Sequence, residues 1–155
     1  MRAVITRVKS ARVKIDGRTH SEIGNGLLIL LGVSTSDSTA DAEYLAKKIS
    51  QMRIFEDSEE KLNLSCSQVH GSMMVVSNFT LYANTQKGNR PSFVDAARPE
   101  LARPLYEYFV ALLRDAGYKT ETGVFGAYME LESVNDGPVT VVMDTEDVFG
   151  KVEKK

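Results

Sequence analysis

A chain of 155 residues, of which 43% are hydrophobic and 26% charged, has the size and composition of one folded domain with a hydrophobic core, which excludes a disordered tail and a multidomain assembly. Its formal net charge of −2 excludes a broad cationic surface, so any contact with nucleic acid should be small and local, and we expect no DNA or membrane partner. With one cysteine, Cys66, and two histidines, His20 and His70, the chain has too few soft ligands for a structural zinc site, and we expect no metal and no cofactor.

The first residues alternate like a core strand, without the apolar segment and small-residue cleavage site that mark a secretory signal. The longest apolar run, residues 27–33, is far shorter than the roughly 20 residues that a membrane span needs. We therefore expect a cytoplasmic protein.

The first third of the chain predicts two strands, a central strand and a helix. Residues 3–15 alternate with the period of a half-buried strand, and Asp16-Gly17 favours a tight hairpin turn into a second strand. Residues 26–33 are apolar on both faces and bounded by glycines, which indicates a central strand covered on both sides. Apolar residues recur at helical spacing over residues 39–52, which predicts a helix.

The middle of the chain predicts a charged loop over residues 56–61, a strand over residues 72–82 and a long loop over residues 83–97. A second helix follows, and because Pro104 does not fit a helix interior, we expect a looser entry over residues 98–103 and regular helix beyond it. This helix should bury the face made of Leu101, Leu105, Tyr108 and Leu112.

The last part, residues 118–145, predicts strands on either side of a break at residues 135–138. A charged, frayed tail should follow over about residues 145–155. The order strands, helix, strand, helix, strands indicates a single mixed α/β domain over residues 1–155, with helices layered on a sheet.

Several common catalytic motifs are missing from the sequence. It contains no GxxxxGK[ST], GxGxxG, HExxH, CxxC or GxSxG. The sequence therefore lacks the motifs that are typical of nucleotide hydrolases, Rossmann-fold cofactor binding and zinc proteases. Both histidines have polar neighbours in the sequence and are expected at the surface, so nothing points to a Ser-His-Asp relay.

Polar residues interrupt an apolar strand at Ser77, Asn78 and Thr80, directly after residues 73–76. In one interpretation they are the satisfied hydroxyls and outward amide of an ordinary strand end. In the other, they form a row of hydroxyl and backbone N–H donors that converge on a carbonyl. The residue types alone leave both interpretations open.

A second polar cluster covers residues 135–140. It could be an ordinary hairpin turn, because Asp136-Gly137 favours positive φ and a proline can open a strand at a sheet edge. Alternatively, Gly137-Pro138 is a rigid cis peptide, a form that costs only about 0.5–1 kcal/mol at such a bond, and it serves as a steric gate.

With these two clusters the sequence closely resembles the D-aminoacyl-tRNA deacylases, small dimeric hydrolases that remove D-amino acids from mischarged tRNA. The resemblance covers almost the whole chain, at residues 7–8, 24–28, 53–55, 77–81, 88–93 and 135–140. It implies a three-layer β/β/α sandwich with mixed or antiparallel sheets and two main helices. It also implies a homodimer with each active site at the subunit interface, acting on the aminoacylated 3′ end of tRNA.

The resemblance assigns roles to residues of both motifs. In the family a Ser-Gln-x-Thr segment lines the aminoacyl-adenosine pocket, and Asn78 stands where the usual residue is Gln, one methylene shorter. An Asn-x-Gly-Pro-x-Thr segment lends a Gly-cisPro unit to the partner's site, as a gate against L-amino acids. The implied catalytic residues are Thr80 and Phe79, the substrate-binding residues Ser77, Asn78, Phe125, Met129, Lys87 and Arg90, the gate Gly137 and Pro138, and the supporting residues Asn135, Thr140 and Arg7.

The chemistry needs no histidine base, because an aminoacyl ester is already activated and has a ribose 2′-hydroxyl beside its carbonyl. We expect substrate-assisted attack, with Thr80 nearest the carbonyl and backbone N–H groups of Phe79 and Thr80 as the oxyanion hole. Lys87 and Arg90 would contact one or two acceptor-stem phosphates, which predicts a shallow salt dependence.

Selectivity against L-aminoacyl-tRNA must be severe, and a preference of about 10⁴-fold corresponds to roughly 5.5 kcal/mol. Rejection by rigid main chain supplies this better than side-chain contacts, and it predicts broad D-amino-acid range with some cleavage of glycyl-tRNA. Two alternatives stay open: a deacylase of this fold tuned to another mischarged product, and a non-catalytic dimer that binds RNA 3′ ends.

Overall fold

The chain begins with the hairpin that its sequence predicts. In the computed structural model, which describes residues 1–150, β1 (Arg2–Ile15) pairs antiparallel with β2 (Arg18–Ile23). Asp16 and Gly17 connect them with φ of 51° and 73°, the left-handed backbone that a tight hairpin turn needs.

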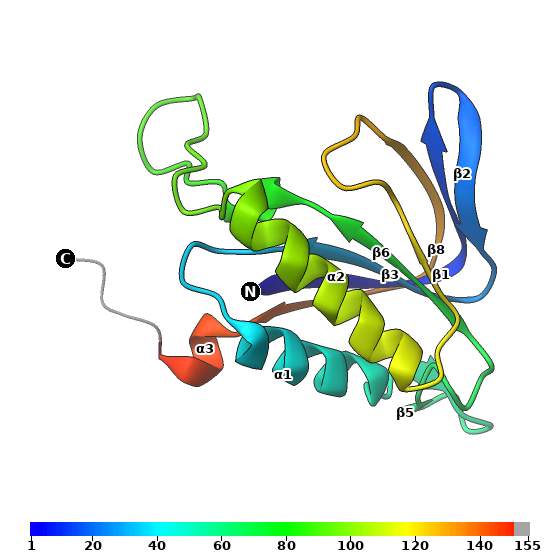
Figure 1. Cartoon of the computed structure of the whole chain (residues 1–155). Helices are drawn as coiled ribbons and strands as arrows, with labels where there is room; N and C mark the ends of the chain where they lie inside the picture. Colours follow the sequence, from blue (N-terminus) through cyan, green and yellow to red (C-terminus); the bar gives the residue numbers. More distant parts are fainter. Residues whose placement is uncertain (151–155) are drawn as a thin grey trace.

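One six-stranded mixed sheet forms the centre of the fold (Figure 1). The central strand β3 (Gly26–Gly32) is almost entirely buried, as predicted, and pairs antiparallel with β1 and parallel with β6 (Ser72–Ser77). Next to β6 lies the short parallel strand β7 (Thr120–Thr122), while β8 (Glu130–Asp144) pairs along the other edge of β1. The sheet order is therefore β2-β1-β3-β6-β7, with β8 on the far side of β1.

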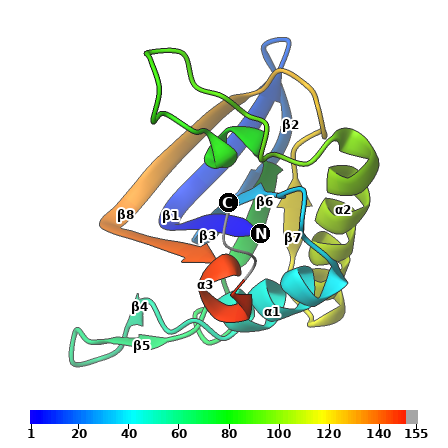
Figure 2. The ribbon, with the colours of Figure 1, turned by 90° about the vertical axis from the view of Figure 1, so that its left-hand side faces the viewer.

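Alternating side chains of β3 enter two different hydrophobic cores. Leu27, Ile29 and Leu31 pack in the core beneath the helices, whereas Leu28 belongs to a second cluster with Val13 of β1. The helices therefore cover one face of the curved sheet, and the β1-β2 hairpin and the start of β8, which belong to the same sheet, fold over its other face, as Figure 2 shows from the side. This arrangement confirms the expected β/β/α sandwich.

The helical layer consists of α1 (Thr39–Ser50) and α2 (Pro99–Asp115). The prediction that α2 becomes regular only after Pro104 is wrong, because the helix runs through the proline without interruption. The carbonyl that loses its N–H partner there belongs to Glu100, an exposed residue of the first turn, where water can replace the missing hydrogen bond.

The predicted apolar face of α2 is also shifted. Leu101 is 38% exposed, and Tyr108 and Leu112 are only half-buried, so Leu105 is the one member of the predicted set that is buried. The face that packs on the sheet consists of Ala102, Leu105, Tyr106, Phe109, Val110 and Leu113. Two overlapping apolar stripes run along this helix, and spacing alone selected the wrong one.

The structure differs from the sequence predictions at three further places. The strand predicted over residues 72–82 ends at Ser77, and a 3-10 helix, η1 (Phe79–Tyr82), follows it. Beside the charged loop, two short strands that the sequence did not suggest, β4 (Phe55–Glu56) and β5 (Leu62–Leu64), form a small hairpin. The break predicted at residues 135–138 is a bulge within β8, where four residues fall opposite Arg7 of β1.

The residues after β8 do not begin a frayed tail, contrary to expectation. Thr145 is fully buried, and α3 (Glu146–Phe149) follows it. The Met1 ammonium lies 2.6 Å from Thr145 Oγ1 and 2.6 Å from the Asp37 carboxylate, which ties the N-terminus to the residue that follows β8. The remainder of the predicted tail, residues 151–155, lies outside the described residues.

This buried contact predicts a stability effect. Thr145 Oγ1 accepts a hydrogen bond from the Met1 ammonium and donates one to Asp41 Oδ1 at 2.5 Å. Thr145→Val therefore removes one hydrogen bond from the buried ammonium and one from the buried carboxylate. We expect the free energy of unfolding to fall by about 1–3 kcal/mol, measured by urea denaturation. The exposed Thr19→Val on β2 is the control, and equal midpoints for the two variants would contradict the prediction.

Across residues 1–150, no helix combines the length and apolarity that a membrane span requires, and no three His, Cys, Asp or Glu residues are grouped so that they could hold a metal ion. Both histidines are exposed, as expected, and Cys66 is a buried free thiol whose pKa burial raises to about 11.

Candidate functional site

The first polar cluster lies at the carboxyl ends of two neighbouring parallel strands. β6 ends at Ser77 beside the end of β3, and the Asn78 N–H donates to the Leu31 carbonyl at 2.8 Å. The packing here is close, because a Cβ added at Gly32 would lie only 3.1 Å from the Asn78 carbonyl oxygen. The end of the sheet therefore fixes the position of η1.

A cavity of about 850 Å³ opens beside η1. It brings together six residues that the sequence placed in the site, from two separate segments: Ser77, Asn78, Phe79, Thr80, Phe125 and Met129. Most of the remaining lining is apolar or aromatic, and it includes Phe93, whose ring meets Phe79 edge to face at 5.2 Å. Phe79 itself is 57% exposed. Such a cavity suits a ligand with flat apolar surfaces and few polar groups.

The side chain of Asn78 folds back onto η1. Its Oδ1 accepts hydrogen bonds from the Thr80 N–H at 3.2 Å and from Thr80 Oγ1 at 2.5 Å, and so caps the 3-10 helix. The Thr80 N–H is thus occupied in this conformation and does not point freely into the cavity as the sequence suggested. The Phe79 N–H, in contrast, has no acceptor among the described residues, because it is the first donor of the helix.

The second polar cluster lies elsewhere on the surface. The Gly137-Pro138 peptide is cis, as the resemblance implies, and both residues are exposed. Neither they nor their neighbours Asn135 and Thr140 line the 850 Å³ cavity of the same chain. Asn135 accepts a hydrogen bond from Ser133 at 2.8 Å, and Thr140 is paired with Thr6 of β1.

The buried side chain of Arg7 fixes the backbone of this cluster. It is 4% exposed, and its guanidinium donates to the Asp136 carbonyl at 3.1 Å and to the Ile54 carbonyl at 3.0 Å. The Asp136 carboxylate lies 3.2 Å from the same side chain. Arg7 therefore joins the bulge of β8 to the segment before β4, and the exposed peptide unit projects from a fixed base.

The two predicted phosphate contacts lie away from the cavity. Lys87 lines a separate hollow with Asn84, Gln86 and Ser92, and Arg90 is exposed on the same loop. The structure thus leaves both cations outside the space where the first motif meets Phe125 and Met129.

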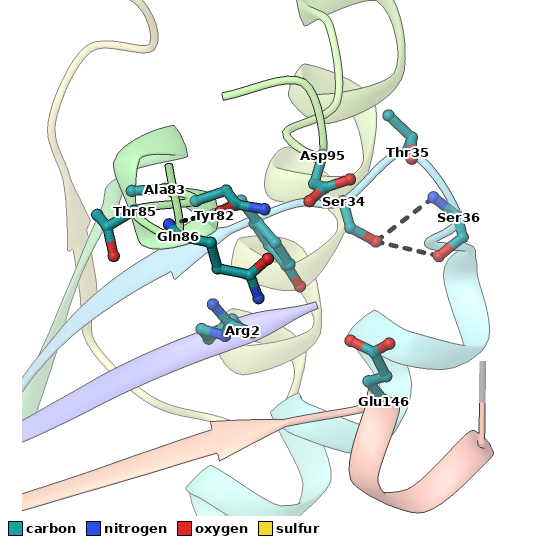
Figure 3. A pocket seen from close by; sticks show the side chains of 11 residues that line it. Arg2, Ser34, Thr35, Ser36, Tyr82, Ala83, Thr85, Gln86, Asp95 and Glu146 are labelled. Atoms are coloured by element: carbon teal, nitrogen blue, oxygen red, sulfur yellow. Dashed lines mark hydrogen bonds between the residues drawn. The ribbon is translucent and has the colours of Figure 1, made fainter. Parts of the chain in front are cut away.

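A second cavity, of about 430 Å³, lies next to η1 (Figure 3). Its wall includes Arg2, a residue that sequence reasoning missed, and Arg2 Nη1 donates to the Leu81 carbonyl at 2.6 Å. The same guanidinium pairs with Asp144 at 2.7 Å and lies 4.7 Å from the centre of the Tyr82 ring. Burial raises the pKa of the Tyr82 hydroxyl above its ordinary value. Arg2 thus anchors the end of the helix that begins with Phe79.

Comparison with known proteins identifies the family to which the chain belongs. Residues 4–144 match the family described as D-Tyr-tRNA(Tyr) deacylase. The chain belongs to this family. A relative of this chain from Desulfatibacillum aliphaticivorans is named D-aminoacyl-tRNA deacylase. It is 57% identical over 94% of this chain and 99% of its own length.

A second curated relative and a solved structure are also similar to this chain. A D-aminoacyl-tRNA deacylase from Koribacter versatilis is 54% identical over 96% of this chain and 100% of its own length. A solved structure named c-Myc DNA Unwinding Element Binding Protein superposes with a TM-score of 0.87 at 38% identity, over 93% of this chain and 98% of that one.

Proposed function

We propose that this protein is a D-aminoacyl-tRNA deacylase, which hydrolyses the ester between a D-amino acid and the terminal adenosine of tRNA. The observation that carries the proposal is the 850 Å³ cavity, in which Ser77, Phe79, Thr80, Phe125 and Met129 meet in a chain of the deacylase family. The relatives named above support the choice of substrate.

The reaction in this cavity relies on positioning and on one backbone donor. Water attacks the carbonyl carbon, the bond to the ribose oxygen breaks, and the proton lost by the water ends on that oxygen. The ribose 2′-hydroxyl beside the ester orients the water, so no protein base is required. The Phe79 N–H stabilises the oxyanion, while Asn78 and Thr80 hold η1 in shape through their own hydrogen bonds.

The active form in this proposal is a homodimer, in which Gly137 and Pro138 of one subunit reach the cavity of the other and exclude L-amino acids. Their exposure, their fixed attachment through Arg7 and their absence from the cavity of their own chain support this arrangement. Exposed apolar surface at the cavity, at Phe79 and at Tyr128, which is 91% exposed, also suits burial by a second copy.

The partner in this proposal is the 3′ end of charged tRNA in the cytoplasm. One solved relative is named for binding DNA, but a net charge of −2 does not favour wide contact with a duplex. A steric gate also admits achiral substrates, so we expect slow cleavage of glycyl-tRNA.

Deacylation of D-Tyr-tRNA, L-Tyr-tRNA and Gly-tRNA tests the function. Cleavage of D-Tyr-tRNA, with or without Gly-tRNA, supports it. Cleavage of L-Tyr-tRNA would favour a deacylase of this fold with another substrate, and binding without turnover would favour a non-catalytic RNA-binding dimer. Cleavage of D-Tyr-tRNA alone among D-aminoacyl-tRNAs would contradict the steric gate.

The anchoring of η1 by Arg2 leads to a further prediction. Arg2→Ala removes the donor to the Leu81 carbonyl and loosens the segment that carries Phe79, so we expect kcat/KM for D-Tyr-tRNA to fall roughly tenfold. Arg12→Ala on the same strand removes only exposed pairs with Glu22 and Glu132 and serves as control. Equal activity of the two variants would show that η1 keeps its place without Arg2.

A further inference from the structure

One wall of the 850 Å³ cavity carries a cation that has no ion-pair or hydrogen-bond partner for its side chain among residues 1–150. Arg98 lines the cavity as the N-cap residue of α2, and its carbonyl accepts the N–H groups of Leu101 at 3.0 Å and Ala102 at 2.9 Å. These bonds fix its backbone. Its side chain is exposed, and among residues 1–150 its guanidinium has neither a hydrogen-bond acceptor nor a carboxylate.

The rest of the lining does not balance this charge. No other lining residue is charged, and no carboxylate is among them; Glu100, the nearest acidic residue in sequence, does not line the cavity. Arginine presents a planar fork of donors that matches phosphate oxygens, and the start of a 17-residue helix adds partial positive charge at the same place. The cavity therefore suits a ligand that combines a flat apolar group with one anion.

This inference rests on the proposed function. An aminoacyl-adenosine end carries a cationic α-ammonium and, across the nucleoside, the 5′-phosphate of the terminal adenosine. A single cation on the wall attracts the phosphate and repels the ammonium, so it sets which way the substrate lies. Lys87 and Arg90, the cations that the sequence singled out, do not line the cavity.

We propose that Arg98 binds the 5′-phosphate of the terminal adenosine and thereby orients the aminoacyl ester toward η1. Arg98 is a binding and positioning residue in this role. Lys87 and Arg90 are left to contact phosphates further along the acceptor end.

Two inert analogues test the assignment directly. In both, D-tyrosine is joined to 3′-amino-3′-deoxyadenosine through an amide, and one of them carries a 5′-phosphate. Calorimetry on the full-length protein should give a lower Kd for the phosphorylated analogue. Arg98→Gln should raise that Kd roughly tenfold and leave the Kd of the other analogue unchanged. Arg98→Lys should recover part of the difference, because it keeps the charge without the fork.

Lys87→Gln and Arg90→Gln are the matched controls, and each should leave both Kd values unchanged. An equal rise for both analogues in Arg98→Gln would indicate a structural role and overturn the assignment. A selective loss in Lys87→Gln or Arg90→Gln, with none in Arg98→Gln, would place the phosphate at the loop and overturn it as well. If neither analogue binds the wild-type protein, the proposed function fails, and this inference fails with it.

Discussion

Replacing Phe79 with proline should lower kcat for D-Tyr-tRNA by about 10²–10³-fold, the usual cost of losing one oxyanion donor. Phe79 is the first residue of η1, and its N–H is the donor that the fold leaves without an acceptor among the described residues. Proline is well tolerated at the first position of a helix, where it deletes this N–H and keeps the backbone course. The measurement is single-turnover deacylation, with circular dichroism as the check on folding.

Two companion variants separate the donor from the side chains. Phe79→Ala removes the ring, including its contact with Phe93, but keeps the N–H. Thr80→Ala removes the hydroxyl, which in the structure donates to Asn78 and not into the cavity. We expect both to stay within about tenfold of the wild type. If Thr80→Ala loses as much activity as Phe79→Pro while circular dichroism shows an intact fold and its Kd for the substrate is unchanged, the hydroxyl is the reacting group and the oxyanion assignment is wrong.

The sequence predicted those parts of the fold in which the conformation that the residue types favour is also the one that the packing of the whole domain requires. Asp16-Gly17 adopts the positive φ that its residue types favour, and the doubly apolar residues of β3 are buried on both faces. The second helix shows the limit of periodicity. Its sequence has two apolar stripes, and only contact with the sheet selects the one through Phe109.

The candidate site could be predicted as a set of residues but not as a geometry. Motif resemblance gave Ser77, Phe125 and Met129, and the cavity brings them together. It could not give the fold-back of Asn78 onto Thr80, which depends on the length of one side chain. Nothing in the sequence indicated that Arg98 belongs to the site, because an arginine before a proline is common at helix starts. Only the structure shows that this helix start forms part of the cavity wall.

Gly137→Ala should damage discrimination between D- and L-substrates. Gly137 has φ of 123°, a backbone that L side chains rarely adopt, and an added Cβ would lie 2.9 Å from the Val139 nitrogen and 3.2 Å from Arg7 Nη2. Arg7 is buried and bound to two carbonyls, so the exposed Pro138 has to move. From a D-over-L preference of about 10⁴-fold, or roughly 5.5 kcal/mol, we expect a loss of at least tenfold. Gly24→Ala, which meets open space without positive φ, is the control.

The same variant can show which subunit supplies the gate. A Gly137→Ala chain keeps an intact cavity, and a Phe79→Pro chain keeps an intact Gly137-Pro138 unit. When the two chains are co-expressed with different tags and the mixed dimer is isolated, one of its two cavities meets an intact gate from the partner. That dimer should cleave D-Tyr-tRNA with the discrimination of the wild type at about half its rate per dimer, although neither parent does so. If the mixed dimer discriminates no better than Gly137→Ala alone, the gate acts within its own chain, and the shared-site arrangement is wrong.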